Sequence, residues 1–241
     1  MAGLALLFIA ILVVVLRQSG LWPRRPVAPE SVEQPGKKSI ADRVAQYGIV
    51  ATARMKPFFE GAGIDYPPAA VTFLGLKEEK RLEVYARNAR GGGWVFIRDY
   101  PILAASGGPG PKLREGDRQV PEGIYRIESL NPNSLYHLSL RVNYPNAFDL
   151  EKAAAEGRDN PGSDIMIHGS DKSIGCLAMG DPASEDLFIL AADVGKENIR
   201  FLLAPCDFRN FPPTNPPEAS PEWLPGLYQS LADEMNGLRR E

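Results

Sequence analysis

The chain has 241 residues, of which 44% are hydrophobic and 24% are charged, and its formal net charge is −3. This length and composition are ordinary for one globular domain with flanking segments. A protein that binds phosphate backbones carries a basic face, so the mildly acidic balance argues against a nucleic-acid partner. Two cysteines are too few for a disulfide framework.

The N-terminal 21 residues differ from the rest of the chain. Residues 2–16 form an unbroken apolar stretch that ends at Arg17. The stretch is shorter than the roughly 20 residues of a membrane span, and no basic region precedes it. The arginines that follow it also oppose the usual preference of positive charge for the cytoplasmic side. We interpret residues 1–21 as an apolar helix that serves as a signal peptide or a membrane anchor, with a buried N-terminal helix as the alternative. Residues 22–39 are rich in proline and charge and read as a linker.

The elements that follow are predicted from the spacing of apolar residues. A helical lead-in is expected over residues 40–64, where apolar residues recur at helical intervals. Short apolar runs predict strands at 70–76, 81–86, 94–100, 123–128, 136–141, 165–168 and 199–203. A helix is predicted over 182–194, with Asp181 as its N-cap and Gly195 as its stop. Residues 206–241 are expected to form a proline-rich arm and a final amphipathic helix.

Many short strands and few helices predict a mostly β domain from residue 65 to 205. A β-sandwich or a semi-closed barrel with flanking helices fits this pattern better than a parallel α/β sheet.

The chemistry of the chain centres on His168 and Cys176, which are eight positions apart. A predicted strand ends at the histidine, and small residues fill most of the interval to the cysteine. A thiol becomes a nucleophile beside a base that can take and return a proton, and histidine titrates near neutral pH. The alternatives are that Cys176 is a small buried hydrophobe and that His168 is a structural residue at a strand end.

Three small residues are expected to support this pair: Gly169, Ser173 and Gly175. Ser173 and Gly175 give the cysteine a tight and open backbone, and glycine permits close approach of a substrate. The amides of Gly175 and Cys176 are candidates to stabilise a developing oxyanion.

Other polar residues rank lower. His137 is a secondary candidate, as an orienting partner or an alternative base, but its bulky neighbours favour a packing role. Asp164 and Asp171 are interpreted as solvated surface groups. No short pair of metal ligands is present beyond His168 and Cys176, so neither a metal nor another cofactor is expected. A disulfide between Cys176 and Cys206 would quench the nucleophile, and the catalytic interpretation therefore predicts its absence.

The segment His168-Gly, followed by Ser173-Ile-Gly-Cys176-Leu-Ala-Met179, resembles the catalytic signature of the L,D-transpeptidase (YkuD-like) family. The stretches at 110–117 and 121–125 resemble the loop and strand that precede the site in that family, and those at 131–134 and 143–146 resemble its YafK-like branch. The resemblance covers residues 70–204. It implies a mostly β catalytic domain, a cysteine nucleophile at Cys176, a histidine acid/base at His168 and a peptidoglycan stem-peptide substrate.

Three departures from the common family pattern stand out. Ile174 replaces a histidine, Ala178 stands where many members carry arginine, and the interval from His168 to Cys176 is short. Each departure fits the YafK-like branch, which resembles enzymes that cut an amide between the stem peptide and an attached lipoprotein. Without that arginine, the site lacks a guanidinium that could bind a substrate carboxylate through two hydrogen bonds.

The expected function is therefore a two-step acyl transfer on diaminopimelate-containing stem peptides through a thioester, in cell-wall biogenesis or remodelling and thus in cell shape. If an amine completes the reaction the protein is a transpeptidase, and if water does it is a hydrolytic amidase acting on a wall-attached lipoprotein. A non-catalytic peptidoglycan-binding module is the competing class. The resemblance places the chain in the periplasm or cell envelope, exported or held at the inner membrane by its N-terminus.

Overall fold

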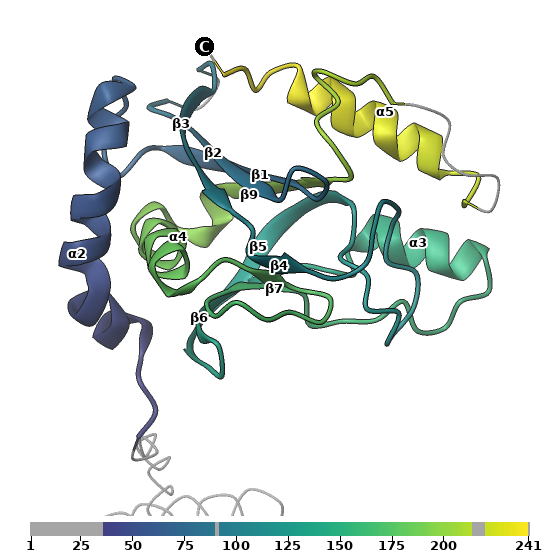
Figure 1. Cartoon of the computed structure of the whole chain (residues 1–241), viewed down its shortest axis with the longest axis horizontal. Coiled ribbons are helices and arrows are strands. Elements are labelled where there is room, and N and C mark those ends of the chain that lie inside the picture. The colour runs from purple at the N-terminus through teal and green to yellow at the C-terminus, as the bar shows by residue number, and fades with distance from the viewer. Residues whose placement is uncertain (1–35, 90–91, 214–219, 241) are drawn as a thin grey trace, which may run out of the picture. The chain divides into compact units, whose positions relative to one another are not determined.

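Figure 1 shows the computed structural model of the chain, which describes residues 36–89, 92–213 and 220–240. The predicted signal peptide or anchor at 1–21 and most of the linker at 22–39 lie outside the described residues. Residues 38–241 group into one unit by their contacts, so the lead-in helix and the C-terminal helix both belong to the body that contains the sheet.

Nine strands form one sheet in the order β3-β2-β1-β9-β5-β6-β7-β8-β4. Two neighbouring pairs, β1–β9 and β7–β8, are parallel, and the other pairs are antiparallel. The strands are β1 (Ala70–Leu76), β2 (Arg81–Arg87), β3 (Val95–Pro101), β4 (Ala104–Ala105), β5 (Gly123–Ser134), β6 (His137–Val142), β7 (Met166–His168), β8 (Leu177–Ala178) and β9 (Ile199–Ala204).

The sheet curls because β5 turns from one set of partners to another. Its first residues, from Gly123 to Arg126, pair with β9, and its later residues pair with β6. The register against β6 shifts twice, after Ile127 and again after Asn131. Such irregularities bend a strand and increase its twist. The resulting half-barrel confirms the predicted mostly β class and corresponds to the semi-closed barrel rather than to the sandwich.

The described helices are α2 (Ile40–Gly61), α3 (Ala147–Ala155), α4 (Asp181–Val194) and α5 (Leu224–Met235), with a 3₁₀ turn at Lys196–Asn198. Helix α2 begins with a capping box, in which the Ser39 hydroxyl accepts from the Asp42 amide and the Asp42 carboxylate accepts from the Ser39 amide. The predicted helices at 40–64, at 182–194 and at the C-terminus are confirmed. The prediction for Asp181 was wrong, since Gly180 is the N-cap of α4 and makes no side-chain cap bond.

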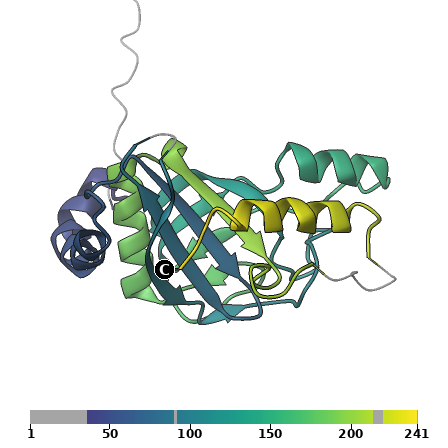
Figure 2. The ribbon, with the colours of Figure 1, turned by 90° about the horizontal axis from the view of Figure 1, so that it is seen from above.

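Two apolar clusters cover the sheet. On β1, Val71 and Phe73 belong to a cluster with α2 and α4, whereas Leu74 and Leu76 belong to a second cluster with α5. Figures 1 and 2 both show α2 beside α4 at one side of the sheet and α5 beside α3 at the other. Burial on both faces explains why every residue of β1 is buried.

A buried ion pair ties the loop before β5 to the sheet and to α5. Lys77 Nζ lies 2.9 Å from Glu122 Oε1 and donates to the carbonyls of Gly110 and Val120 at 3.0 Å. The Gly110 amide and the Tyr228 hydroxyl both donate to the Glu122 carboxylate at 2.8 Å. The hydrogen bonds and the ion pair of Lys77 and Glu122 therefore hold the loop that begins after β4.

None of the described helices is both long enough and apolar enough to cross a membrane.

Candidate functional site

The neighbouring strands β7 and β8 bring His168 and Cys176 to one face of the sheet. Their parallel register pairs Ile167 with Leu177 and His168 with Ala178. Cys176 immediately precedes β8, and its thiol meets the Met166 amide of β7. Continued by one step, the register would set Cys176 opposite Met166 and thus on the face of His168, diagonally across the two strands.

The Cys176 thiol rests against the start of β7. Its Sγ lies 3.6 Å from the Asp164 carbonyl oxygen, to which it donates. Burial raises the pKa of the thiol above its usual value, and the Asp164 carboxylate adds to this, while the Met166 amide and the Lys112 ammonium lower it. The thiol is therefore protonated at neutral pH in the substrate-free protein.

His168 is almost fully buried and is held in one tautomer. Its Nδ1 lies 2.5 Å from the Gly169 carbonyl oxygen. A carbonyl can only accept, so Nδ1 carries the proton and Nε2 is left as the basic nitrogen. The Tyr136 ring covers the imidazole at a centroid distance of 4.7 Å. Burial lowers the pKa of His168 and thus favours the neutral base. The hydrogen bond to the Gly169 carbonyl has the opposite, smaller effect and raises the pKa.

His137 is the first residue of β6, directly after the turn from β5, and its ring is directed to other partners. Its backbone has a left-handed φ of 71°, and its Nε2 lies 3.0 Å from Glu185 Oε1 of α4. The ring also packs edge-on against Tyr47 of α2. These contacts serve to join the turn to the two helices, which is the packing role favoured by the sequence.

The two amides expected to face an oxyanion are bound to serine hydroxyls in this structure. The Gly175 amide donates to Ser106 Oγ at 2.5 Å, and the Cys176 amide donates to Ser173 Oγ at 2.9 Å. Ser173 Oγ also donates to the Cys176 carbonyl at 2.5 Å, so it closes the turn that presents the cysteine. Gly175 has a φ of +92°, which favours glycine at this corner.

Gly169 is required by close packing. A Cβ on this residue would lie 2.6 Å from Asp181 Oδ1 and 2.9 Å from the Tyr136 carbonyl oxygen. Asp181 uses the same Oδ1 to accept from the Ser170 amide at 2.8 Å, which fixes the chain just after His168.

Gly169→Ala is expected to lower the free energy of unfolding by about 1–3 kcal/mol, because the tight backbone contacts must open. Urea denaturation measures this change. Gly226→Ala is the matched control, since a Cβ at Gly226 in α5 meets no atom within 4 Å and alanine favours a helix. Equal stability of the two variants would contradict the packing argument.

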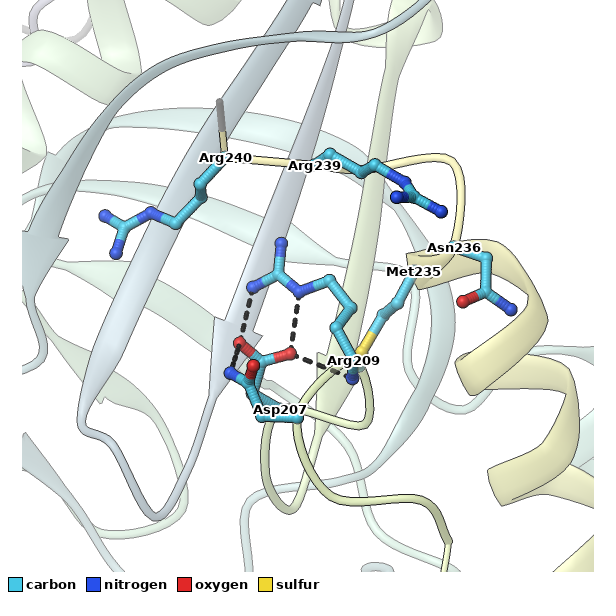
Figure 3. Close-up of a pocket in the computed structure, with 7 residues that line it drawn as sticks. Asp207, Arg209, Met235, Asn236, Arg239 and Arg240 are labelled. Atoms are coloured by element: carbon cyan, nitrogen blue, oxygen red, sulfur yellow. Dashed lines mark hydrogen bonds and ion pairs between the residues drawn. The ribbon is translucent and has the colours of Figure 1, made fainter.

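Figure 3 shows a polar pocket near the C-terminal end of the chain. Its volume is about 330 Å³, and none of the residues that line it belongs to the Cys176 turn. Arg209 lies at its centre and donates to both carboxylate oxygens of Asp207, to the Tyr85 hydroxyl and to the Leu238 carbonyl. Since these contacts hold the C-terminal segment against the sheet, we assign them a structural role.

The cysteines at 176 and 206 are both free thiols. Asp164 is exposed and paired with Arg141, and Asp171 is exposed. Within the described ranges, no group of three or more His, Cys, Asp or Glu side chains is placed to hold a metal ion.

Sequence reasoning missed Ser106, Tyr136 and the hydrogen bond from the Ser170 amide to the Asp181 carboxylate. Ser106 is 69 residues from Gly175 in the chain and meets it because β4 pairs with β8. The Tyr136 contact depends on the left-handed residue that follows it. The sequence placed Tyr136 only at the start of the predicted strand 136–141.

These features define a mostly β half-barrel in which His168 ends β7 and Cys176 directly precedes the neighbouring strand β8. A family model described as the L,D-transpeptidase catalytic domain (YkuD) matches residues 75–197, about half of the chain. The chain belongs to this family. The family acts on peptidoglycan stem peptides.

The chain is similar to the candidate L,D-transpeptidase YafK of Escherichia coli strain K12, with 38% identity over 115 residues. The alignment covers 47% of this chain and 44% of YafK, so the matched part is less than half of that relative. The protein from Escherichia coli O157:H7 gives the same values.

Two solved structures are more distant. The helical cell shape determining protein Pgp2 of Campylobacter jejuni is 23% identical, with a TM-score of 0.45, over 57% of this chain and 48% of Pgp2. Bd1075 of Bdellovibrio bacteriovorus is 22% identical, with a TM-score of 0.40, over 71% of this chain and 57% of Bd1075.

Proposed function

We propose that the chain is a cysteine-dependent peptidoglycan L,D-transpeptidase that acts on diaminopimelate-containing stem peptides through a thioester, in cell-wall biogenesis and remodelling. The observation that carries this proposal is the parallel pairing of β7, which ends at His168, with β8, which begins directly after Cys176, in a member of this family. The tautomer of His168 adds to it, since Nε2 is free to accept a proton.

In the first step, the Cys176 Sγ–H proton passes to His168 Nε2 as the sulfur attacks the diaminopimelyl carbonyl. The thiol turns from the Asp164 carbonyl toward the imidazole for this transfer. The tetrahedral intermediate then collapses, the C–N bond breaks, and the imidazolium returns its proton to the leaving amine. Burial favours the neutral form of both groups in the substrate-free site, and the proposed step therefore moves the proton as the sulfur attacks.

The oxyanion of the tetrahedral intermediate would take the acceptor position that Ser106 Oγ or Ser173 Oγ holds in the substrate-free site. The amides of Gly175 and Cys176 are bound to these hydroxyls, so one serine must move away before the substrate oxygen can take its place.

In the second step, an amine or water attacks the thioester and releases the acyl group. An amine acceptor makes the chain a transpeptidase, and its similarity to a candidate L,D-transpeptidase supports this choice. Water makes it an amidase that cuts the bond between peptidoglycan and an attached lipoprotein. Ala178 is fully buried and carries no charge, which supports a substrate geometry different from the common one.

The substrate lies outside the inner membrane, so the proposal also places the catalytic unit in the periplasm or cell envelope, exported or anchored through residues 1–21. Fusion of residues 1–39 to alkaline phosphatase tests this placement, because that enzyme is active only after export. An inactive fusion that is stably expressed would contradict it.

The reaction is tested by mass spectrometry of purified muropeptides incubated with the full chain. The substrates are a tetrapeptide monomer and a stem peptide that carries a lysine-linked peptide. New cross-linked dimers establish a transpeptidase, and release of the lysine-linked peptide without dimers establishes an amidase.

Two cysteine variants control this assay. Cys176→Ala is expected to abolish every product, and Cys206→Ala is expected to retain them, because Cys206 packs in the cluster beneath α5. If the folded wild-type chain forms neither product, the non-catalytic peptidoglycan-binding module takes the place of the enzyme.

A further inference from the structure

A pocket of about 710 Å³ lies between the loop that precedes β5 and the segment that follows α3. One wall comes from residues 109–119 and the other from residues 158–160, and Ser220 and Pro221 of the proline-rich arm complete it. No step of the proposed acyl transfer uses this pocket.

Both walls lead directly to the cysteine turn. The Gln119 carbonyl oxygen lies 3.8 Å from the position that a Cβ on Gly175 would take. The other wall continues four residues beyond Asn160 to Asp164, whose carbonyl accepts from the Cys176 thiol. The pocket therefore borders the segments that hold the cysteine turn, through Gln119 on one wall and residues 160–164 on the other.

Two of the lining charges have no partner among the described residues, namely the Arg114 guanidinium and the Asp159 carboxylate. The other two charged side chains that line the pocket already have partners. Arg158 is bonded to Glu156 and to the Leu113 carbonyl. Asp117 accepts from Lys112 Nζ at 2.6 Å and from three backbone amides. The pocket therefore offers one positive and one negative group to a ligand.

We propose that this pocket binds the free amino-acid end of the diaminopimelyl side chain, with Arg114 bound to its carboxylate and Asp159 to its ammonium group. Naming diaminopimelate rests on the proposed function. A peptide C-terminus would offer only a carboxylate, whereas the distal centre of diaminopimelate carries both charges on one carbon.

Binding to the full chain with Cys176→Ala, measured by isothermal titration calorimetry, tests this assignment without turnover. The ligands are the tetrapeptide L-Ala-γ-D-Glu-meso-diaminopimelyl-D-Ala and an analogue in which the distal diaminopimelyl carboxylate is an amide. Since Arg114 is exposed, the amide analogue is expected to bind about fivefold more weakly than the tetrapeptide. Adding Arg114→Gln is expected to remove that difference.

Arg118→Gln is the matched control, because Arg118 is exposed on the same loop and does not line the pocket. It is expected to keep the fivefold preference. The assignment is overturned if the Arg114→Gln protein keeps the preference, or if the tetrapeptide does not bind.

The muropeptide assay separates this inference from the proposed function. Products from the wild-type chain without any dependence of binding on Arg114 would remove the pocket assignment alone. Binding that depends on Arg114, without products from the wild-type chain, would instead remove the proposed reaction and leave the pocket as a recognition site.

Discussion

His168→Ala is expected to lower kcat/KM for the acyl transfer by about a thousandfold, because general acid–base catalysis contributes roughly 10²–10⁴ to the rate. The loss should appear mainly in kcat, since the imidazole acts on the proton and not on substrate affinity. His137→Ala is the matched control. Its ring bonds to Glu185 and packs on Tyr47, so this variant should lose some stability and keep its rate. Equal rates for the two variants would remove His168 from the mechanism.

The pH dependence gives a second readout of the same residue. Burial holds the pKa of His168 below its usual value of about 6.5, so the acid limb of kcat/KM is expected below pH 6.5. The free energy of unfolding is also expected to decrease as the pH falls. As the pH falls below about 6.5, the unfolded state binds the proton before the folded state does, and the free energy of unfolding decreases until the folded-state pKa is passed.

Urea denaturation at pH 7.5 and at pH 5 measures the effect on stability. The wild-type chain is expected to lose more stability than His168→Gln over this interval. An acid limb above pH 6.5 would show instead that the imidazole is stabilised as a cation in the folded protein.

The long strands and the helices were predictable because each carries its own periodic pattern. Residues 70–76 and 199–203 are apolar runs of the kind that a strand buried on both faces requires, and they pair in the structure. Helix α3 was missed, although Asn146 and Asp149 form a capping box at its start. Its nine residues give too few turns for a periodic signal to emerge.

The partners of His168 and Cys176 depend on tertiary structure that no local pattern records. Strands β4 and β8 contain two residues each and exist because they pair with each other. That pairing brings Ser106 to the Gly175 amide across 69 residues of sequence. The sequence identified the two candidate reactive side chains by their residue types and their eight-residue spacing. The groups that hold them come together only when the sheet curls, so the sequence did not identify them.

Glu122→Leu is expected to destabilise the chain by about 3–5 kcal/mol, which is the usual cost of removing one partner of a buried ion pair. The Glu122 side chain is fully buried, and Lys77 is 6% exposed. The substitution leaves the Lys77 ammonium with two carbonyl acceptors but no counter-charge, and it removes the acceptor of the Gly110 amide and the Tyr228 hydroxyl. Burial already lowers the pKa of Lys77, so the uncompensated charge has no favourable environment.

Glu60→Leu provides the surface comparison, since Lys56 and Glu60 are 58% and 64% exposed and lie 3.6 Å apart. That variant is expected to change stability by at most about 0.5 kcal/mol. The double variant Lys77→Met with Glu122→Leu should recover part of the loss, because it leaves no buried charge unpaired. Urea denaturation of the wild-type chain and of the three variants measures each change in the free energy of unfolding. If Glu122→Leu costs no more than Glu60→Leu, the loop beside the cysteine turn is held by its backbone contacts and not by this network.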